Sequence, residues 1–437
     1  MHLCILGGGL SAITAALFLQ EKDTISKITI LEKEEKAGGL CRTFKTNGIE
    51  WDVGPHIIFS KDKEVLDFMN KCLGCNNQQH RRSNRIIHDK RFVQYPFEND
   101  LSKLSDKDKF ICLNGFLHNP YENYLPSNML QFFLSTFGEG ITNLYLRPYN
   151  EKIWKFDPSF MDTQMVERIP RPPKEDIIKS AAGTTVDGYT HQLYFNYPKF
   201  GGTEALIKSL INKFSNKVEL ITNAEVESVK KCGNAFVINA SGHSYSADKI
   251  ISTIPLGRFV DIYSSETNKV PDSVRNAGSA LRHNSIAICI VNVKHDFAGD
   301  NYAFMIADRD VIFHRISKLD FMGSGYHINN SVTYMAEVTY RSNDIYDKMS
   351  DDHLKCQVVE GLQKIGFIQS IDDVNFAEVK RFDYSYVIYD LMHKHNTALI
   401  KEYLSTEGVE TNGRFGTFEY LNMDAVIRQS MILAAKF

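Results

Sequence analysis

The pattern of apolar and polar positions is clearest at the start of the chain. Apolar residues dominate positions 2–6 (HLCIL), return at helical spacing over 10–19, and form a second run, KITIL, at 27–31. A short apolar run followed by helical spacing predicts a buried strand that leads into a helix, and the second run predicts the next strand. Gly7–Gly9 stand at the strand-to-helix turn. The pattern predicts an α/β fold that opens with a β-α-β unit.

The glycines at this turn fit a known spacing. Gly7, Gly9 and Ala12 match G-x-G-x-x-A, in which the first position permits a tight turn and the second lets a pyrophosphate approach the backbone. The small third position lets helix and strand pack closely, and the helix N-terminus faces the phosphates. Glu32 follows about 20 residues later, where an acid accepts hydrogen bonds from a ribose. We predict a dinucleotide-binding site.

Composition and charge narrow the function classes. The chain has 437 residues, 43% hydrophobic and 24% charged, with a net charge of -3, which is ordinary for a globular protein and offers no long-range attraction for nucleic acid. No apolar stretch has the roughly 18 residues that a membrane helix needs. Eight scattered cysteines predict reduced thiols and a cytoplasmic location, and one isolated CLGC pair is too weak a pattern to predict a metal.

A second glycine motif, KAGGLCRT, indicates which dinucleotide is bound. Gly38 and Gly39 create another close approach of the backbone, and Arg42 adds a fixed cation. The motif resembles the GG-x-x-R-T signature of the superfamily of flavin amine oxidases, protoporphyrinogen oxidases and UDP-galactopyranose mutases. The resemblance implies non-covalent FAD, reduced in the active form. We expect the cofactor to be bound by Gly7, Gly9, Ser11, Ala12, Glu32, Lys33, Gly38, Gly39, Leu40, Arg42, His56, Ile57, Val226, Arg414, Met423 and Asp424.

The resemblance also implies a division into domains. In that superfamily a Rossmann-like FAD-binding domain is assembled from separated pieces, and strand-like runs here permit the same division. We assign residues 1–60, 199–256 and 408–437 to the FAD-binding domain. Residues 61–198 are predicted to form a mainly helical insertion, and 257–407 a mixed β-sheet substrate domain.

Four further stretches resemble mutase segments around the flavin and the sugar nucleotide. DVGPHIIFS is similar to a loop whose histidine lies beside the flavin ring, which makes His56 the candidate catalytic residue. RPYNEKIW, YSYVIYDL and GRFGTFEYLNMDAVI resemble segments that supply pocket aromatics and flavin contacts. In the mutases an arginine on the substrate diphosphate lies fourteen residues after the tryptophan. The implied substrate-binding residues are Tyr149, Trp154, Arg168, Asn284, Tyr386 and Tyr420.

Two segments depart from the mutase pattern. The mutases have a second diphosphate-binding arginine in a strand whose best match here is LRHNSI, which puts Asn284 at that position and Arg282 two residues before it. The segment LYFNYPKFGG is more similar to protoporphyrinogen oxidases.

Two functions are therefore weighed. One is a sugar-nucleotide mutase for polysaccharide precursors, in which reduced flavin supplies the nucleophile for pyranose–furanose exchange and NAD(P)H is the expected electron donor. The other is an FAD-dependent oxidoreductase that takes hydride from a C–N or C–O bond. A protein that holds FAD structurally is a third reading, and the sequence leaves a homo-oligomer open.

Overall fold

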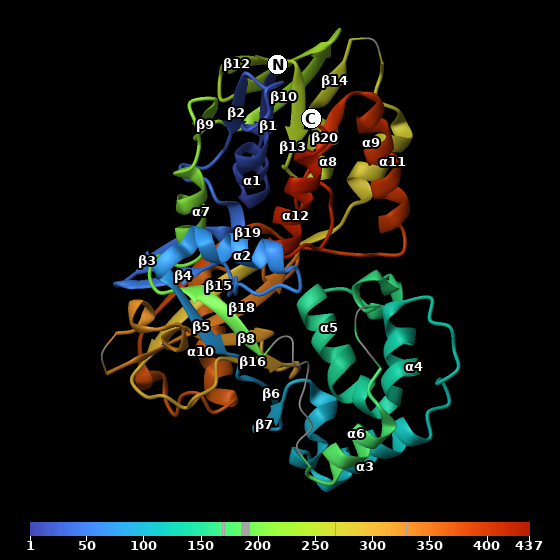
Figure 1. The fold of residues 1–437 in the computed structure, drawn as a ribbon. Helices are drawn as coiled ribbons and strands as arrows, with labels where there is room; N and C mark the ends of the chain where they lie inside the picture. The colour runs from blue at the N-terminus through green and yellow to red at the C-terminus, as the bar shows by residue number, and fades with distance from the viewer. Residues whose placement is uncertain (168, 170, 185–192, 267, 329) are drawn as a thin grey trace.

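The computed structural model describes residues 1–167, 169, 171–184, 193–266, 268–328 and 330–437. An upper body in Figure 1 contains both termini and is built on a five-stranded parallel sheet. In spatial order its strands are β20 (Val409–Thr411), β13 (Lys249–Ser252), β1 (His2–Leu6), β2 (Lys27–Leu31) and β9 (Val218–Ile221). The order brings together strands from three distant parts of the chain.

This parallel sheet is buried on both faces, which explains the unbroken apolar run of β1. Leu3 and Ile5 pack toward helix α1, whereas Cys4 and Leu6 belong to a core shared with a four-stranded mixed sheet. This sheet consists of β12 (His243–Ala247), β11 (Ala235–Ala240), β10 (Val226–Cys232) and β14 (Tyr263–Ser265), and β14 pairs parallel with β10. A strand covered on both sides has no polar face to alternate with.

Helices complete the upper body. On the face opposite the four-stranded sheet, α1 packs against α12 and α7, and α2 packs against α7 and α12. These helices are α1 (Leu10–Leu19), α2 (Lys63–Leu73), α7 (Glu204–Ile211) and α12 (Met423–Ala434). A second group, beside β20, comprises α8 (Leu256–Ile262), α9 (Asp272–Ala280) and α11 (His393–Thr406).

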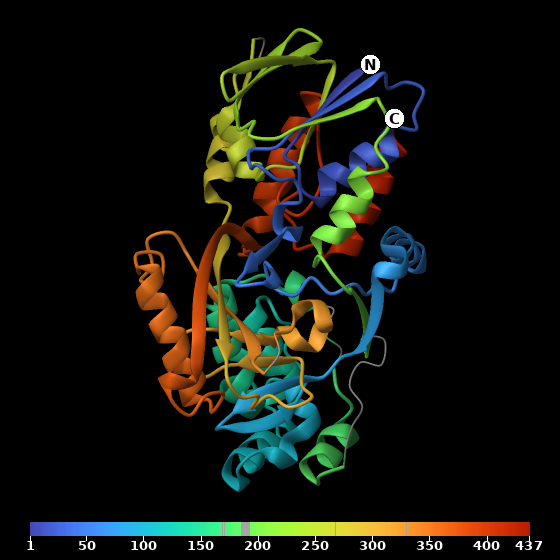
Figure 2. The ribbon, with the colours of Figure 1, turned by 90° about the vertical axis from the view of Figure 1, so that its left-hand side faces the viewer.

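The lower body contains a seven-stranded mixed sheet. Its spatial order is β19 (Val374–Val387), β15 (His283–Val293), β18 (Val332–Tyr340), β17 (Arg315–Lys318), β16 (Ala303–Ile306), β6 (Asn84–His88) and β7 (Arg91–Gln94). Along β15 the side chains alternate: Ala287 and Cys289 face helix α10 (Asp351–Lys364), and Ile286 and Ile288 face inward. Figure 2 shows α10, in orange, on the outer side of this sheet.

Four helices stand beside the inner face of this sheet (Figure 1). They are α3 (Asp106–Leu117), α4 (Met129–Ile141), α5 (Arg147–Trp154) and α6 (Lys174–Ala181). Side chains of Ser105 and Asn128 cap α3 and α4 by accepting from backbone N–H groups. A single π-helical turn, Thr142–Leu146, joins α4 to α5.

The segment 61–198, predicted as mainly helical, also supplies strands. Besides β6 and β7, it contains β5 (Asn77–Arg81) and β8 (Tyr194–Pro198), which pair with each other. A separate hairpin that precedes this segment pairs β3 (Thr43–Thr46) with β4 (Ile49–Asp52). Polar residues dominate NQQHR in β5 and NRIIH in β6, so apolar alternation gave little strand signal there.

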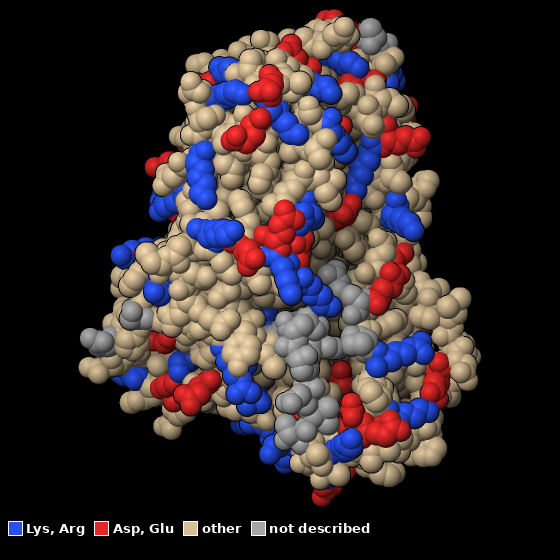
Figure 3. Space-filling view, in the orientation of Figure 1, with Lys and Arg blue, Asp and Glu red and all other residues tan. Residues whose placement is uncertain are grey.

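A basic surface stripe, a membrane-spanning helix or a cluster of metal ligands would each indicate another class of function. Figure 3 shows lysines and arginines interspersed with acidic residues across the visible face, without a basic stripe. Within the described ranges, no helix is both long and apolar enough to cross a membrane, and no three His, Cys, Asp or Glu residues gather as a metal site would require.

Candidate functional site

A cavity of about 900 Å³ lies where the two bodies meet. The turn after β1, the end of β2, the segment 38–42, the loop 53–59 and the N-terminal end of α12 line one part of it. Strands β15, β16, β17 and β19 and helix α5 line the other part. The carboxyl ends of parallel strands commonly form ligand sites, and here they open into this space.

The two glycine motifs meet backbone to backbone at the upper end of the cavity. Gly38 N–H donates to Gly8 O at 2.8 Å, and Gly9 and Gly38 form an isolated parallel bridge. Gly39 has a φ of +57°, and a Cβ there would lie 3.3 Å from Gly9 Cα. A Cβ on Gly9 would meet no atom within 4 Å, so this glycine borders open space that a ligand can fill.

Two helices begin at the cavity wall. Leu10 and Ser11 open α1, and Met423 and Asp424 open α12, and all four residues line the cavity. The first N–H groups of a helix lack intrahelical acceptors and carry partial positive charge. The two N-termini therefore make this end of the cavity suitable for a phosphate or pyrophosphate.

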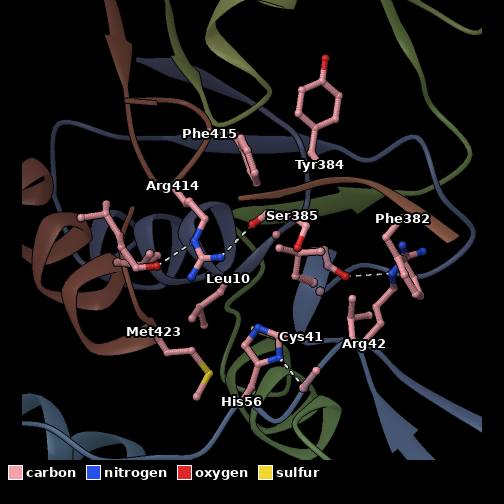
Figure 4. Close-up of a pocket in the computed structure, with 18 of the residues that line it drawn as sticks. Leu10, Cys41, Arg42, His56, Phe382, Tyr384, Ser385, Arg414, Phe415 and Met423 are labelled. Carbon is pink, nitrogen blue, oxygen red and sulfur yellow. Dashed lines mark hydrogen bonds between the residues drawn. The ribbon is translucent and has the colours of Figure 1, made fainter. Parts of the chain in front are cut away.

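Glu32 and Arg42 are held rigidly next to the glycines. The Glu32 carboxylate is buried and accepts from Gly8 N–H at 2.6 Å and Glu34 N–H at 2.9 Å. Arg42 donates from Nε to Gly39 O at 2.9 Å and pairs with Glu34 at 3.0 Å. Figure 4 shows Arg42 near Cys41 on the cavity wall. Because these groups are fixed by backbone contacts, they form a preorganised polar edge.

His56 sits in the wall next to Arg414 (Figure 4). Its Nδ1 lies 3.1 Å from Gly54 O, and since a carbonyl only accepts, Nδ1 carries the proton. Burial, with Arg414 nearby, lowers the pKa of His56 to about 3, and the bond to Gly54 O opposes this only in part. The imidazole is therefore neutral at physiological pH, with Nε2 left as a hydrogen-bond acceptor.

Arg414 braces three segments around the cavity. It donates from Nε to Leu421 O at 2.8 Å and from Nη1 to Ser385 O at 3.1 Å, as Figure 4 shows. Its guanidinium also lies 4.9 Å from the centre of the Tyr420 ring. The remaining cofactor candidates Lys33, Leu40, Ile57 and Val226 line the same cavity.

Tyrosines form the wall at the lower end. Tyr149, Tyr386 and Tyr420 line the cavity. So do Tyr95, the first residue of the stretch YPFEND, which resembles a mutase segment near the pocket, and Tyr302, which sequence reasoning did not single out. The candidate substrate residue Trp154 stands one layer behind and is 5% exposed. Its ring meets Tyr386 at 5.7 Å and Tyr420 at 5.9 Å, both edge to face. Ala12 also lies behind the wall, in the core between α1 and the parallel sheet.

A fixed cation that the sequence analysis missed is Arg315 on β17. It lines the cavity and makes a bidentate pair with Glu337 of β18, with Nη2 to Oε2 at 2.7 Å. Glu337 is fully buried, and its carboxylate would lie 3.4 Å from a Cβ on Gly54. His314 beside it is fully buried, and burial and Arg315 lower its pKa well below 6.5, so it is neutral. One feature of the sequence could have revealed this pair: Glu337 is an acid in the otherwise apolar strand segment VTYMAEVTY, and a buried acid needs a cationic partner.

Neither Asn284, predicted to bind substrate in place of the second mutase arginine, nor the nearby Arg282 lines the cavity. Asn284 does not line the cavity: it is fully buried and its amide bonds to Ile153 O, Trp154 O and Arg341. The Arg282 side chain is 55% exposed and pairs with Asp390. Two arginines do line the cavity: Arg315, and Arg82 of the basic stretch RRSNR at 81–85, which the sequence predicts as an alternative source of charge to Arg282. Arg168 lies outside the described residues.

Comparisons with known proteins agree with this geometry. The model of the flavin containing amine oxidoreductase family matches residues 10–395. The UDP-galactopyranose mutase of Mycoplasma genitalium is 24% identical over 227 residues, which are 48% of this chain and 51% of that protein. The matched stretch thus spans about half the length of the curated relatives.

Similar folds are found among solved structures. A reduced UDP-galactopyranose mutase has a TM-score of 0.90 at 22% identity, covering 99% of this chain and 93% of that one. A protein assigned as a protoporphyrinogen oxidase, from Exiguobacterium sp. 255-15, has a TM-score of 0.76 at 17% identity and covers 100% and 98%. These structural similarities establish the fold, and the family match, which covers most of the chain, establishes the family. The chain belongs to the family of flavin-containing amine oxidoreductases.

Proposed function

We propose that the flavin of this protein is non-covalently bound FAD, held along the upper end of the cavity. The open backbone at Gly9 and the two helix N-termini suit a pyrophosphate. The fixed carboxylate of Glu32 suits a ribose hydroxyl. These features would place the flavin ring toward His56 and Arg414, and all eight cysteines are free thiols, in keeping with a reducing, cytoplasmic compartment.

The reaction we propose is pyranose–furanose interconversion of a UDP-sugar, as in UDP-galactopyranose mutases, with an electron donor such as NAD(P)H keeping the flavin reduced. The observation that carries this proposal is the charge of the lower cavity. Arg82 and Arg315 line the cavity together with tyrosines, and Arg315 pairs with the nearby carboxylate of Glu337. Two guanidinium groups against one carboxylate leave a net positive charge. Such a wall attracts a diphosphate and repels a protonated amine.

The protein residues then have distinct tasks. Reduced flavin, when bound, supplies the nucleophile for the sugar carbon. Arg315 and Arg168 hold the diphosphate, and Tyr149, Tyr386 and Tyr420 shape the sugar pocket and exclude water. Neutral His56 accepts a hydrogen bond at Nε2 without adding charge beside the flavin.

The test is direct. Purified protein is reduced with dithionite under anaerobic conditions and incubated with UDP-galactofuranose, and the products are separated by chromatography. We expect UDP-galactopyranose to form only with reduced flavin, and heat denaturation of the protein to release intact FAD. Failure to bind or convert any nucleoside-diphosphate sugar in either redox state would contradict the mutase proposal.

The family match favours one alternative, an FAD-dependent oxidoreductase. In that case an amine or alcohol alone should bleach the oxidised flavin. The same anaerobic cuvette distinguishes the two, because a mutase substrate perturbs the flavin spectrum without a net redox change.

A further inference from the structure

The last turn of α5 ends against side chains of the seven-stranded sheet. The last carbonyls of a helix have no intrahelical donor and need partners. Thr339 Oγ1 of β18 donates to Lys152 O at 2.8 Å, and Asn284 Nδ2 of β15 donates to Ile153 O at 3.1 Å and Trp154 O at 2.6 Å. Two strands thus cap three successive carbonyls of the helix that carries Tyr149 and Trp154.

Asn284 uses its whole amide in this arrangement. Besides the two bonds donated by Nδ2, its Oδ1 accepts from Arg341 Nε at 2.9 Å. The residue is fully buried, and its donor group therefore cannot turn to water. Its orientation is fixed from one side by Arg341 and from the other by the helix end.

The same residue is also the cross-strand neighbour of a cavity tyrosine. Asn284 and Tyr386 are paired positions of β15 and β19, next to a register shift between Asn284 and Ile286. The Trp154 ring lies edge to face on Tyr386 and Tyr420. The Asn284 side chain therefore bonds to the backbone of Trp154, and the Asn284 backbone lies opposite Tyr386 in the sheet.

We propose that Asn284 is a positioning residue: through its two hydrogen bonds to the end of α5 it sets Trp154, whose ring backs the cavity wall at Tyr386 and Tyr420. The inference rests on the proposed function only for its effect on turnover. A displaced wall misplaces the sugar, and a misplacement of about 1 Å can reduce the rate by about a hundredfold.

The chain offers a spectroscopic readout that does not depend on the reaction. It contains two tryptophans, Trp51 and Trp154, so a Trp51→Phe background leaves Trp154 as the only tryptophan. Asn284→Asp keeps the size of the side chain and the acceptor for Arg341 but removes both donors to α5. In flavin-loaded protein we expect a red shift of Trp154 emission, stronger acrylamide quenching and a ten- to hundredfold lower kcat/KM, with FAD content unchanged.

Asn292 provides a matched control on the same strand. It is also buried, and its amide donates to Ser331 and Thr333 and accepts from Asn375. Asn292→Asp should lower thermal stability comparably and leave Trp154 emission and kcat/KM unchanged. If Asn284→Asp matches this control in emission and kcat/KM, Asn284 is merely structural and the proposal is wrong.

A second variant covers the case in which Asn284→Asp does not fold. Thr339→Val keeps the shape of a buried side chain and removes the hydroxyl that donates to Lys152 O. A smaller red shift of Trp154 emission in this variant supports the positioning role of the capping bonds, and unchanged emission contradicts it. If wild-type protein converts no UDP-sugar, the proposed function fails while the emission still decides the role of Asn284.

Discussion

The two ends of the cavity are built in different ways. At the upper end, backbone groups form the surface: glycines 8, 9, 38 and 39 and the first turns of α1 and α12. At the lower end, side chains form the surface and come from α5, β17 and β19. A backbone surface is encoded in short local motifs, whereas a side-chain surface depends on how distant strands are registered.

The ends also obtain their positive charge differently. The upper end relies on partial charges of helix N-termini and on Arg42, which is anchored within eight residues of its own position. The lower end relies on the guanidinium groups of Arg82 and Arg315, and a buried carboxylate from the neighbouring strand holds Arg315. We therefore expect steric changes to weaken ligand binding most at the upper end, and loss of charge to weaken it most at the lower end.

The largest effect on ligand binding is expected at the upper end, from Gly39→Ala. Gly39 has a φ of +57°, and the added Cβ would lie 3.3 Å from Gly9 Cα. Crowding there should distort the pyrophosphate site and lower FAD affinity at least about a hundredfold, or about 2.7 kcal/mol. Flavin absorbance after gel filtration measures the loss.

Gly233→Ala is the control for backbone strain. Gly233 has a φ of +58°, almost the same as Gly39, but its Cβ would meet nothing within 4 Å. Both variants should lose about 1 to 2 kcal/mol of stability from the left-handed conformation, and only Gly39→Ala should lose FAD. Equal FAD content in the two variants would show that crowding at the glycine contact is unimportant.

At the lower end, Arg315→Met should leave Glu337 buried without its partner. Breaking a buried ion pair in this way costs about 3 to 5 kcal/mol, and loss of the cation should weaken nucleotide binding about ten- to a hundredfold. The double variant Arg315→Met, Glu337→Leu separates the two effects. Chemical denaturation should show stability regained, and calorimetry should show UDP affinity still low; recovered affinity would make Arg315 purely structural.

Arg168→Ala tests a cation that the sequence resemblance implies. A charge-assisted hydrogen bond to a diphosphate contributes about 1.5 to 3 kcal/mol, so UDP affinity should fall about ten- to a hundredfold with FAD content and melting temperature unchanged. Arg171→Ala, at an exposed position three residues later, is the control and should bind UDP normally. A lower melting temperature with unchanged affinity would assign Arg168 to a structural ion pair.

The difference between the two ends also explains what could be predicted from the sequence. The β1–α1 turn, Glu32 and the Gly38–Gly39 motif all line one cavity as expected, because spacing over a few residues fixes their positions. Arg315 escaped detection because its partner Glu337 lies 22 residues away and meets it only through strand pairing. The prediction for Asn284 was wrong for a related reason. A motif match can identify the strand, but it does not determine which face of the strand reaches the cavity.

The smallest effect is a pH dependence at the junction of the two ends. The pKa of His56 in the folded protein, about 3, is below the ordinary value of 6.5, so folding is favoured while the histidine is neutral. This contribution is complete above pH 6.5 and declines as pH falls toward 3, because the unfolded chain then takes up a proton that folded His56 does not. Between pH 7 and pH 5 the loss should be about 1 kcal/mol, with allowance for partial exposure. Denaturation of wild type and His56→Gln at both pH values measures this loss, and the variant should lack this part of the pH dependence. Equal pH dependence in the two proteins would mean that His56 titrates normally and is charged in the cavity wall at pH 5.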